Sequence, residues 1–207
     1  MSTWTIVPMR GLAAGKSRLA PVLGPAARLA LNALLLRTAL DAVVAMDGSA
    51  ARCIVASAGQ DALALARQRG AVPLEEAPGT GLNAALTAAR EAAVARGAES
   101  LLVLPADLPG VTGAALARLR AARPAGTAAI VADRCGTGTN GLLLPARAGL
   151  AFGFGEGSLM RHRDALLALG LDTLVWRDAD LAFDIDTAED YLAWKAGLAA
   201  ARQRGAA

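Results

Sequence analysis

The sequence predicts an α/β fold, with a mostly parallel sheet, helices on both faces and one domain. Strand-like and helix-like segments alternate along the chain, which favours βαβ units. The run SLLVLP at 100–105 has consecutive apolar residues, typical of a strand buried on both faces of a parallel sheet. The length of 207 residues suits one domain with its own core. In such folds, ligands bind beyond the carboxyl ends of the strands.

The first half of the chain predicts three strands and three helices. Residues 3–9, TWTIVPM, form the first strand-like run. Residues 25–46 repeat apolar side chains at three- and four-residue spacing, as in a long helix with one buried face. The further segments are a strand at 52–57, a helix at 60–70, a short strand at 71–74 that contains Pro73, and a helix at 82–97.

The second half continues the alternation. The strand that begins at residue 100 ends abruptly where prolines flank Asp107, and residues 134–141 are expected to form a glycine-rich loop. The further segments are a helix at 112–122, strands at 127–133 and 142–146, a helix at 159–169, a strand at 172–176, an acidic loop and a last helix from 187. We expect one domain over 1–200 and a frayed tail at 201–207.

The composition restricts the classes of function. The hydrophobic fraction is 55%, but no stretch of about 20 apolar residues is free of charge, so we expect no membrane span. The N-terminal residues lack the pattern of a signal peptide, and we expect a cytoplasmic protein. The net charge is +3, yet only 3% of residues are aromatic. Small anions are therefore better expected partners than nucleic acids.

The turn at 7–21, VPMRGLAAGKSRLAP, resembles a phosphate-binding loop but is not a Walker A motif. That motif needs four residues before its Gly-Lys-Ser, and only three separate Gly11 from Gly15. A P-loop NTPase is therefore disfavoured. Lys16, Ser17 and Arg18 still follow the first strand, where backbone amides and cations meet phosphates in many proteins.

Three aspartates are candidates for holding a cation. Asp107 lies just past the buried strand and between two prolines, which restrict its backbone. Asp184 and Asp186 lie two residues apart on an extended segment, so both side chains point to one face while Ile185 points to the other. Carboxylates together with substrate phosphates are the ligands that Mg²⁺ prefers. The alternative is that Asp107 serves a turn or helix cap, and that Asp186 only adds charge at the start of a helix.

Two glycine-rich loops are candidates for binding an anion. The first, GTGTNG at 136–141, offers Thr139 and Asn140; the second, FGFGEGS at 152–158, ends in Ser158 at the start of a predicted helix. Either loop could instead be an ordinary turn. His162, the only histidine, lies one turn past Ser158, where it could touch the same anion or be solvated. One histidine excludes a multi-histidine metal site.

Six blocks of sequence together resemble the CofC family of guanylyltransferases, in order and over nearly the whole chain. The blocks are VPMRGLAAGKSRL, PGTGLNAAL, LPADLP, GTGTNGLLL, FGEGS followed by RH, and FDIDTAEDY. Members of that family transfer the GMP part of GTP to 2-phospho-L-lactate or phosphoenolpyruvate, with release of pyrophosphate, in the synthesis of the deazaflavin coenzyme F420. The resemblance implies a Rossmann-like mixed sheet of the GT-A nucleotidyltransferase type.

The resemblance also implies roles for particular residues. Lys16 and Asp107 would be catalytic, and Asp107, Asp184 and Asp186 would bind Mg²⁺. The GTP site would comprise Pro8, Arg10, Lys16, Arg18, Gly81 and Asn83. The phospho-acid, which is 2-phospho-L-lactate, phosphoenolpyruvate or 3-phosphoglycerate, would be held by Thr139, Asn140, Gly155 and Ser158. Arg10 departs from the lysine expected there, and Glu156 from a proline. A homodimer is the default assembly.

Two other functions stay open at this point. A molybdenum-cofactor or sugar-nucleotide nucleotidyltransferase would share the fold, the opening turn and the aspartates. Such relatives usually have a Gly-Gly opening, which this sequence lacks. A non-catalytic nucleotide-binding or interaction domain would leave the set of carboxylates unexplained.

Overall fold

The computed structural model describes residues 2–77 and 79–205, without the side chains of 201–205. Its centre is one seven-stranded sheet in the order β3-β2-β1-β4-β6-β5-β7. The strands are β1 (Thr3–Pro8), β2 (Cys53–Ser57), β3 (Val72–Glu75), β4 (Ser100–Val103), β5 (Ala128–Ala132), β6 (Thr139–Pro145) and β7 (Thr173–Trp176). This confirms the predicted α/β class.

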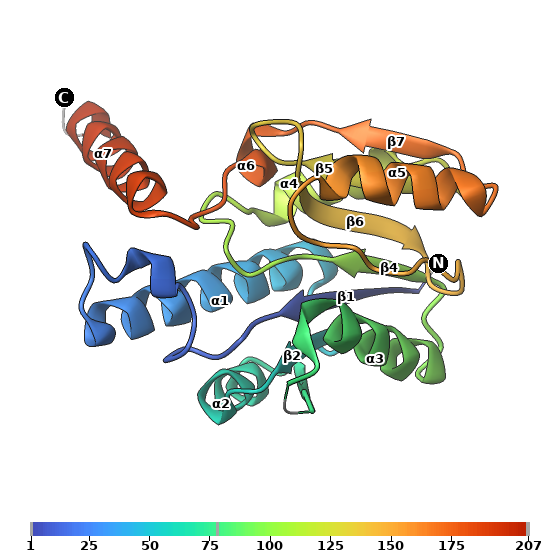
Figure 1. Ribbon diagram of the computed structural model, residues 1–207, viewed down its shortest axis with the longest axis horizontal. Coiled ribbons are helices and arrows are strands. Elements are labelled where there is room, and N and C mark those ends of the chain that lie inside the picture. The colour runs from blue at the N-terminus through green and yellow to red at the C-terminus, as the bar shows by residue number, and fades with distance from the viewer. Residues whose placement is uncertain (1, 78, 206–207) are drawn as a thin grey trace.

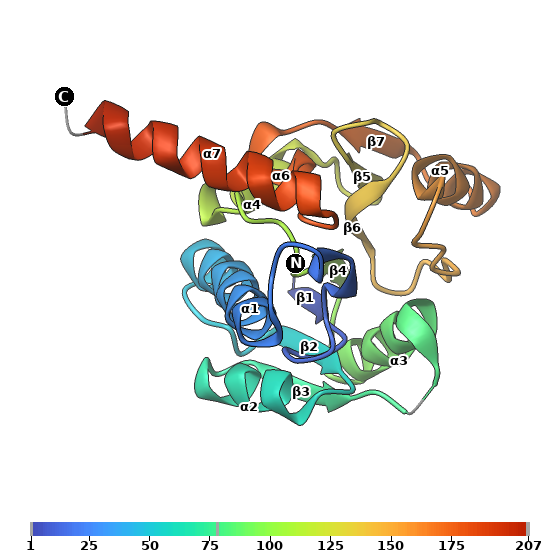
Figure 2. The ribbon, with the colours of Figure 1, turned by 60° about the vertical axis from the view of Figure 1, so that its left-hand side comes forward.

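Helices cover both faces of the sheet (Figures 1 and 2). They are α1 (Pro25–Asp47), α2 (Gln60–Gln68), α3 (Gly81–Ala95), α4 (Gly113–Ala122), α5 (Ser158–Ala168), α6 (Ala179–Ala182) and α7 (Ala188–Gly205), with a 3-10 turn, η1 (Ser17–Leu19). One core cluster takes side chains from α1, α2 and α4, and a second takes side chains from α3 and α5. Successive residues of β1 alternate between them, Ile6 in one and Val7 in the other.

The sheet is mixed, as the family resemblance implies, and its antiparallel pairs lie in its second half. β6 runs antiparallel to both β4 and β5, while β1, β2, β3 and β4 pair in parallel. Residues 139–141, expected in a loop, begin β6. A connection as short as 133–138 leaves no room for a crossover helix, so it joins antiparallel neighbours.

Two helices lie in the C-terminal part of the chain, the first of them in a segment expected to be a loop. The acidic loop contains α6, a short helix capped by Asp178, whose carboxylate accepts from the Asp180 N–H at 3.0 Å. The last helix, α7, projects from the body of the molecule in both ribbon views and continues through residue 205, into the segment expected to fray (Figures 1 and 2). Residues 206 and 207 lie outside the described part of the chain.

Among the described residues, α1 is the one helix whose length and hydropathy would allow it to cross a membrane. Half of its most apolar stretch is buried inside the protein. Leu36 and Leu40 join the core beside α4, and Leu31 and Leu35 pack against residues of η1 and α7. Packing on several sides accounts for the apolar composition of this helix.

Candidate active site

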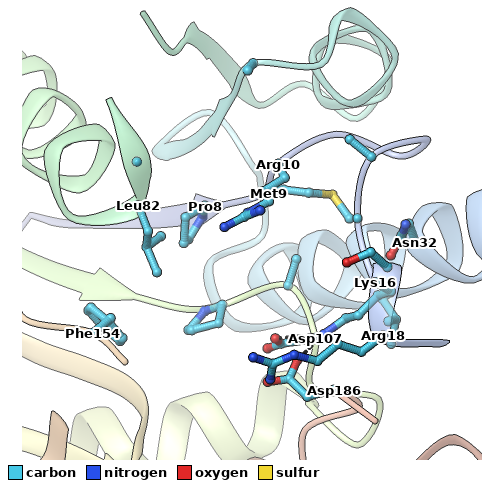
Figure 3. Close-up of a pocket in the computed structure, with 18 of the residues that line it drawn as sticks. Pro8, Met9, Arg10, Lys16, Arg18, Asn32, Leu82, Asp107, Phe154 and Asp186 are labelled. Carbon is cyan, nitrogen blue, oxygen red and sulfur yellow. Dashed lines mark hydrogen bonds and ion pairs between the residues drawn. The ribbon is translucent and has the colours of Figure 1, made fainter. Parts of the chain in front are cut away.

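A pocket of about 740 Å³ opens at the carboxyl ends of β1, β2 and β4 (Figure 3). Parallel strands present these ends at one edge, so the loops that follow them surround a common space. The lining residues are Pro8, Met9, Arg10, Ala14, Gly15, Lys16, Ser17, Arg18, Asn32, Leu35, Ala58, Glu76, Gly81, Leu82, Pro105, Ala106, Asp107, Phe154 and Asp186. Seven of these belong to the predicted site, namely Pro8, Arg10, Lys16, Arg18, Gly81, Asp107 and Asp186.

Lys16 joins the two acidic segments across the pocket. Its Nζ lies 3.0 Å from Oδ2 of Asp107 and 2.8 Å from Oδ1 of Asp186, and only 12% of its side chain is exposed. Burial lowers the pKa of Lys16, but attraction to the two carboxylates outweighs burial and the pKa is raised. Lys16 is therefore a fixed ammonium ion. Figure 3 shows Arg18 lying beside it, next to the same two aspartates.

The turn that carries Lys16 is held from two helices. At the start of α2, the carboxylate of Asp61 accepts hydrogen bonds from the N–H groups of Leu12 and Ala13, both at 3.1 Å. From α1, Nδ2 of the buried Asn32 donates to the Leu12 carbonyl at 2.7 Å. Because its polar groups are bound on both sides, the turn has its shape without any ligand.

The turn also packs closely against the loop after β2. Gly11 has φ +130°, a conformation that favours glycine. A Cβ atom added to Gly59 would lie 2.6 Å from the Cα of Gly11. Both positions therefore need glycine for the two loops to meet.

A backbone hydrogen bond aligns the two acidic segments. The Ile185 N–H donates to the Asp107 carbonyl at 3.1 Å, and the Ile185 side chain is fully buried. This confirms that Ile185 points into the core. The start of α7 is fixed by Asp190, which accepts from the N–H groups of Asp186 (3.0 Å) and Thr187 (2.7 Å) and pairs with Arg134. Asp190 and Thr187 thus form a reciprocal capping pair at the start of α7.

The three aspartates form a negatively charged cluster rather than a finished metal centre. Among the described residues, no group of three or more His, Cys, Asp or Glu side chains is arranged to hold a metal ion. Burial raises the pKa of Asp184, and the charges of Asp107 and Asp186 raise it further. Like charges so placed favour a cation, and the Lys16 ammonium is the cation between Asp107 and Asp186 here. The donor set suits a hard divalent ion in charge and ligand type.

The wall opposite Lys16 comes from β1, β3 and α3. Arg10 lies in this wall beside Glu76. Burial raises the pKa of Glu76, and the charge of Arg10 offsets only part of that rise. Gly81 lines the pocket at the first residue of α3. Asn83 does not line the pocket but fixes Phe154, which does: its Oδ1 accepts from the Phe154 N–H at 2.9 Å.

The residues predicted for the phospho-acid gather between β6 and α5. Thr139 and Ser158 are buried. A backbone hydrogen bond from the Leu159 N–H to the Thr137 carbonyl, at 3.1 Å, joins the two loops, and one from the Ser158 N–H to the Gly155 carbonyl, also at 3.1 Å, closes the second loop. Asn140 differs from the others. Its Nδ2 donates to the carbonyls of Leu181 (3.1 Å) and Ala182 (3.0 Å), so its amide holds the segment that leads to Asp184.

Comparison with known proteins assigns the family. Residues 3–194 match the sequence model of a family described as guanylyl transferase CofC like. The chain belongs to the CofC family. Phosphoenolpyruvate guanylyltransferases of Rubrobacter xylanophilus and Sphaerobacter thermophilus are each 39% identical to this CofC chain. The alignments cover 92% of this chain in both cases, and 92% and 91% of the relatives.

Solved structures of nucleotidyltransferases share the CofC fold. A CMP:2-keto-3-deoxy-manno-octonic acid synthetase complexed with CTP aligns with a TM-score of 0.66 at 12% identity, over 96% of this chain and 99% of the other. A 4-diphosphocytidyl-2C-methyl-D-erythritol synthase from Anaerococcus prevotii aligns with a TM-score of 0.64 at 12% identity, over 95% and 98%. Family and fold together identify a nucleotidyltransferase enzyme.

Sequence reasoning missed several residues that line the pocket or hold its walls. Asn32 had a signal, because it is a polar side chain on the apolar face of a long helix. Asp61 and Glu76 had none, since each depends on which loops meet at the edge of the sheet. The solvated alternative for His162 is wrong, because the side chain is fully buried.

Proposed function

We propose that the protein transfers the guanylyl group of GTP to the phosphate of phosphoenolpyruvate or a closely similar phospho-acid, in the synthesis of a deazaflavin coenzyme. An acid phosphate oxygen attacks the α-phosphorus of GTP, a new P–O bond forms, and the bond to the β-phosphate breaks to release pyrophosphate. The main observation behind the proposal is one pocket lined by three cations, Lys16, Arg18 and Arg10, together with the carboxylates of Asp107 and Asp186. Among the phospho-acids we propose phosphoenolpyruvate first, because curated relatives are named phosphoenolpyruvate guanylyltransferase.

The cations would bind the triphosphate. Lys16 is fixed by two carboxylates, so its charge is in place before GTP arrives and little orientation entropy is lost on binding. Arg18 lies beside it and Arg10 faces it from the other wall. Pro8 and Gly81 would border the nucleotide, and Asn83 would act through Phe154.

Magnesium would be held by Asp107, Asp184 and Asp186, whose mutual repulsion a divalent cation relieves. When bound, the ion would neutralise charge on the phosphate oxygens of GTP. The Lys16 ammonium, which pairs with two of the three carboxylates, would add its positive charge beside them.

The phospho-acid would lie against Thr139, Gly155 and Ser158, with Asn140 positioning the neighbouring acidic segment. Ser158 begins α5, and the positive end of the helix dipole at that terminus favours an anion. The acid phosphate is already a nucleophile, so no general base is required. The remaining task is to align the attacking oxygen with the leaving pyrophosphate, for which a rigid site suffices.

The decisive experiment measures pyrophosphate release from GTP and Mg²⁺ with each of four acceptors: phosphoenolpyruvate, 2-phospho-L-lactate, 3-phosphoglycerate and a sugar 1-phosphate. We expect release with phosphoenolpyruvate and none without an acceptor. Release only with the sugar phosphate would assign a sugar-nucleotide enzyme instead. No release with any acceptor would refute the proposed function.

The metal role is tested by replacing Asp107 with asparagine. We expect the rate to fall about 100-fold or more, because one anionic ligand and one partner of Lys16 are lost together. Asp164→Asn, at an exposed position of α5, is the matched control and should keep the wild-type rate. A near-normal rate for Asp107→Asn would contradict the metal assignment.

A further inference from the structure

His162 is the only histidine of the chain and is fully buried, and the proposed function gives it no role. Its ring joins the two loops of the phospho-acid site. Nε2 lies 3.0 Å from the backbone nitrogen of Gly153, and Nδ1 lies 3.0 Å from Oγ1 of Thr139. The edge of the ring contacts Phe154, with centroids 4.8 Å apart.

These contacts determine where the ring carries its proton. A backbone N–H can only donate, so Nε2 must accept from Gly153 through its lone pair. Burial, with a smaller effect of the nearby Arg161, lowers the pKa of His162 to about 4, so the ring is neutral at pH 7. A neutral ring carries one proton, and that proton is therefore on Nδ1.

The tautomer in turn sets the direction of the next hydrogen bond. Nδ1–H donates to Oγ1 of Thr139, which leaves the hydroxyl hydrogen of Thr139 free to point elsewhere. Within the described part of the chain, the side chain of Thr139 has no other hydrogen-bond partner. A buried hydroxyl whose oxygen is already occupied is prepared to donate to an acceptor such as a phosphate or carboxylate oxygen.

We propose that His162 is a positioning residue for the phospho-acid: as the neutral Nδ1–H tautomer it fixes the Thr139 hydroxyl as a donor and ties it to the Gly153 loop. This inference rests on the proposed function, which puts the acid at Thr139, Gly155 and Ser158. Both hydrogen bonds of His162 go to the loops of the acid site, and the ring meets the GTP pocket only through Phe154, so its main effect should fall on the acid.

The kinetic test compares three variants. His162→Gln places an acceptor near the Gly153 N–H but no donor toward Thr139, and Thr139→Val removes the hydroxyl. We expect each to raise the KM for the acid about tenfold, the size expected for one hydrogen bond to a charged group, with a much smaller change in the KM for GTP. The double variant should be no worse than Thr139→Val, because both changes break one chain of contacts.

The results that would overturn the inference are an unchanged acid KM, an equal rise in both KM values, or additive effects in the double variant. Circular dichroism checks that the variants fold. If they do not fold, the decision falls to the wild-type protein labelled with ¹⁵N-histidine, whose single ring gives an unambiguous spectrum. A protonated Nδ1 and a bare Nε2 support the proposal, and the reverse tautomer or a charged ring overturns it.

Failure of the inference is distinguishable from failure of the proposed function. Wild-type protein that is inactive with every phospho-acid refutes the function, and with it the acid-binding part of the inference. Activity of the wild type together with a silent His162→Gln refutes the inference alone.

Discussion

Lys16 combines an unusual backbone conformation with two ion pairs. It is the one described residue other than glycine with a positive φ, +57°. This left-handed conformation is unfavourable for a side chain with a Cβ atom by about 1 kcal/mol. The ion pairs with Asp107 and Asp186 offset that cost and direct Nζ into the pocket.

Two substitutions at Lys16 separate the effect of the charge from the effect of the backbone conformation. Lys16→Gly and Lys16→Ala should both lose most of the activity, because both lack the ammonium ion. In urea unfolding, however, Lys16→Gly should be more stable than Lys16→Ala by about 1 kcal/mol, since glycine adopts a positive φ freely. Equal unfolding free energies would mean that the turn relaxes and that the left-handed backbone carries no cost.

The sequence indicated Lys16 as a phosphate ligand but not as a partner of the aspartates. Local sequence shows a cation in a glycine-containing turn, whereas its partner Asp186 is 170 residues away along the chain. The same limit applies to Asn140. Its position in a glycine-rich stretch suggested a loop residue facing a ligand, but β6 begins one residue earlier and directs its amide to the backbone before Phe183.

At the scale of elements, the contact of the first turn with the loop before α2 shapes the side of the pocket proposed to bind GTP. Gly11 and Gly59 lie so close that a Cβ atom on Gly59 would clash with the backbone of Gly11. Asp61 adds two hydrogen bonds to the same contact. The position of Lys16 thus depends on α2, an element that does not itself provide a predicted ligand.

Gly59→Ala tests this dependence. The added Cβ would lie 2.6 Å from backbone, so the turn must shift; we expect a higher KM for GTP and a loss of about 1–3 kcal/mol in unfolding free energy. Gly24→Ala is the control, because nothing lies within 4 Å of its added Cβ and its φ is −65°. If both variants bind GTP like the wild type, α2 has no part in shaping the site.

Most helices and strands could be predicted from periodicity and from glycine and proline positions, because these are local signals. The direction of β6 could not be predicted from its apolar residues, which look alike in parallel and antiparallel strands. The short connection 133–138 was the available signal, since a parallel neighbour needs a longer crossover. The four-residue α6 was hidden because its turn is too short for any periodic pattern.

At the scale of the whole molecule, the single buried histidine links stability to pH. The folded protein binds a proton at His162 only near pH 4, whereas an unfolded chain binds one near its ordinary value of 6.5. Between these values the unfolded state holds more protons, so the contribution to stability is complete above about pH 6.5 and is lost as the pH falls toward 4.

We therefore expect this group to cost about 3 kcal/mol of unfolding free energy between pH 7 and pH 4. Denaturant unfolding across that range, compared with His162→Gln, isolates the effect from other titrating groups. The advantage of the wild type over the variant should shrink as the solution is acidified. A difference that stays constant with pH would show that His162 is not buried in its neutral form.

The pairing of Lys16 with Asp186 also has a consequence for biosynthesis. A chain leaving the ribosome presents the cation first and its second carboxylate partner only 170 residues later. The hydrogen bond from Ile185 to Asp107, which aligns the acidic segments, must wait for the same residues. A nascent chain that has completed β1 to β7 but not residues 184–186 therefore still lacks the Lys16–Asp186 ion pair, so the proposed site forms only after the whole sheet has been synthesised.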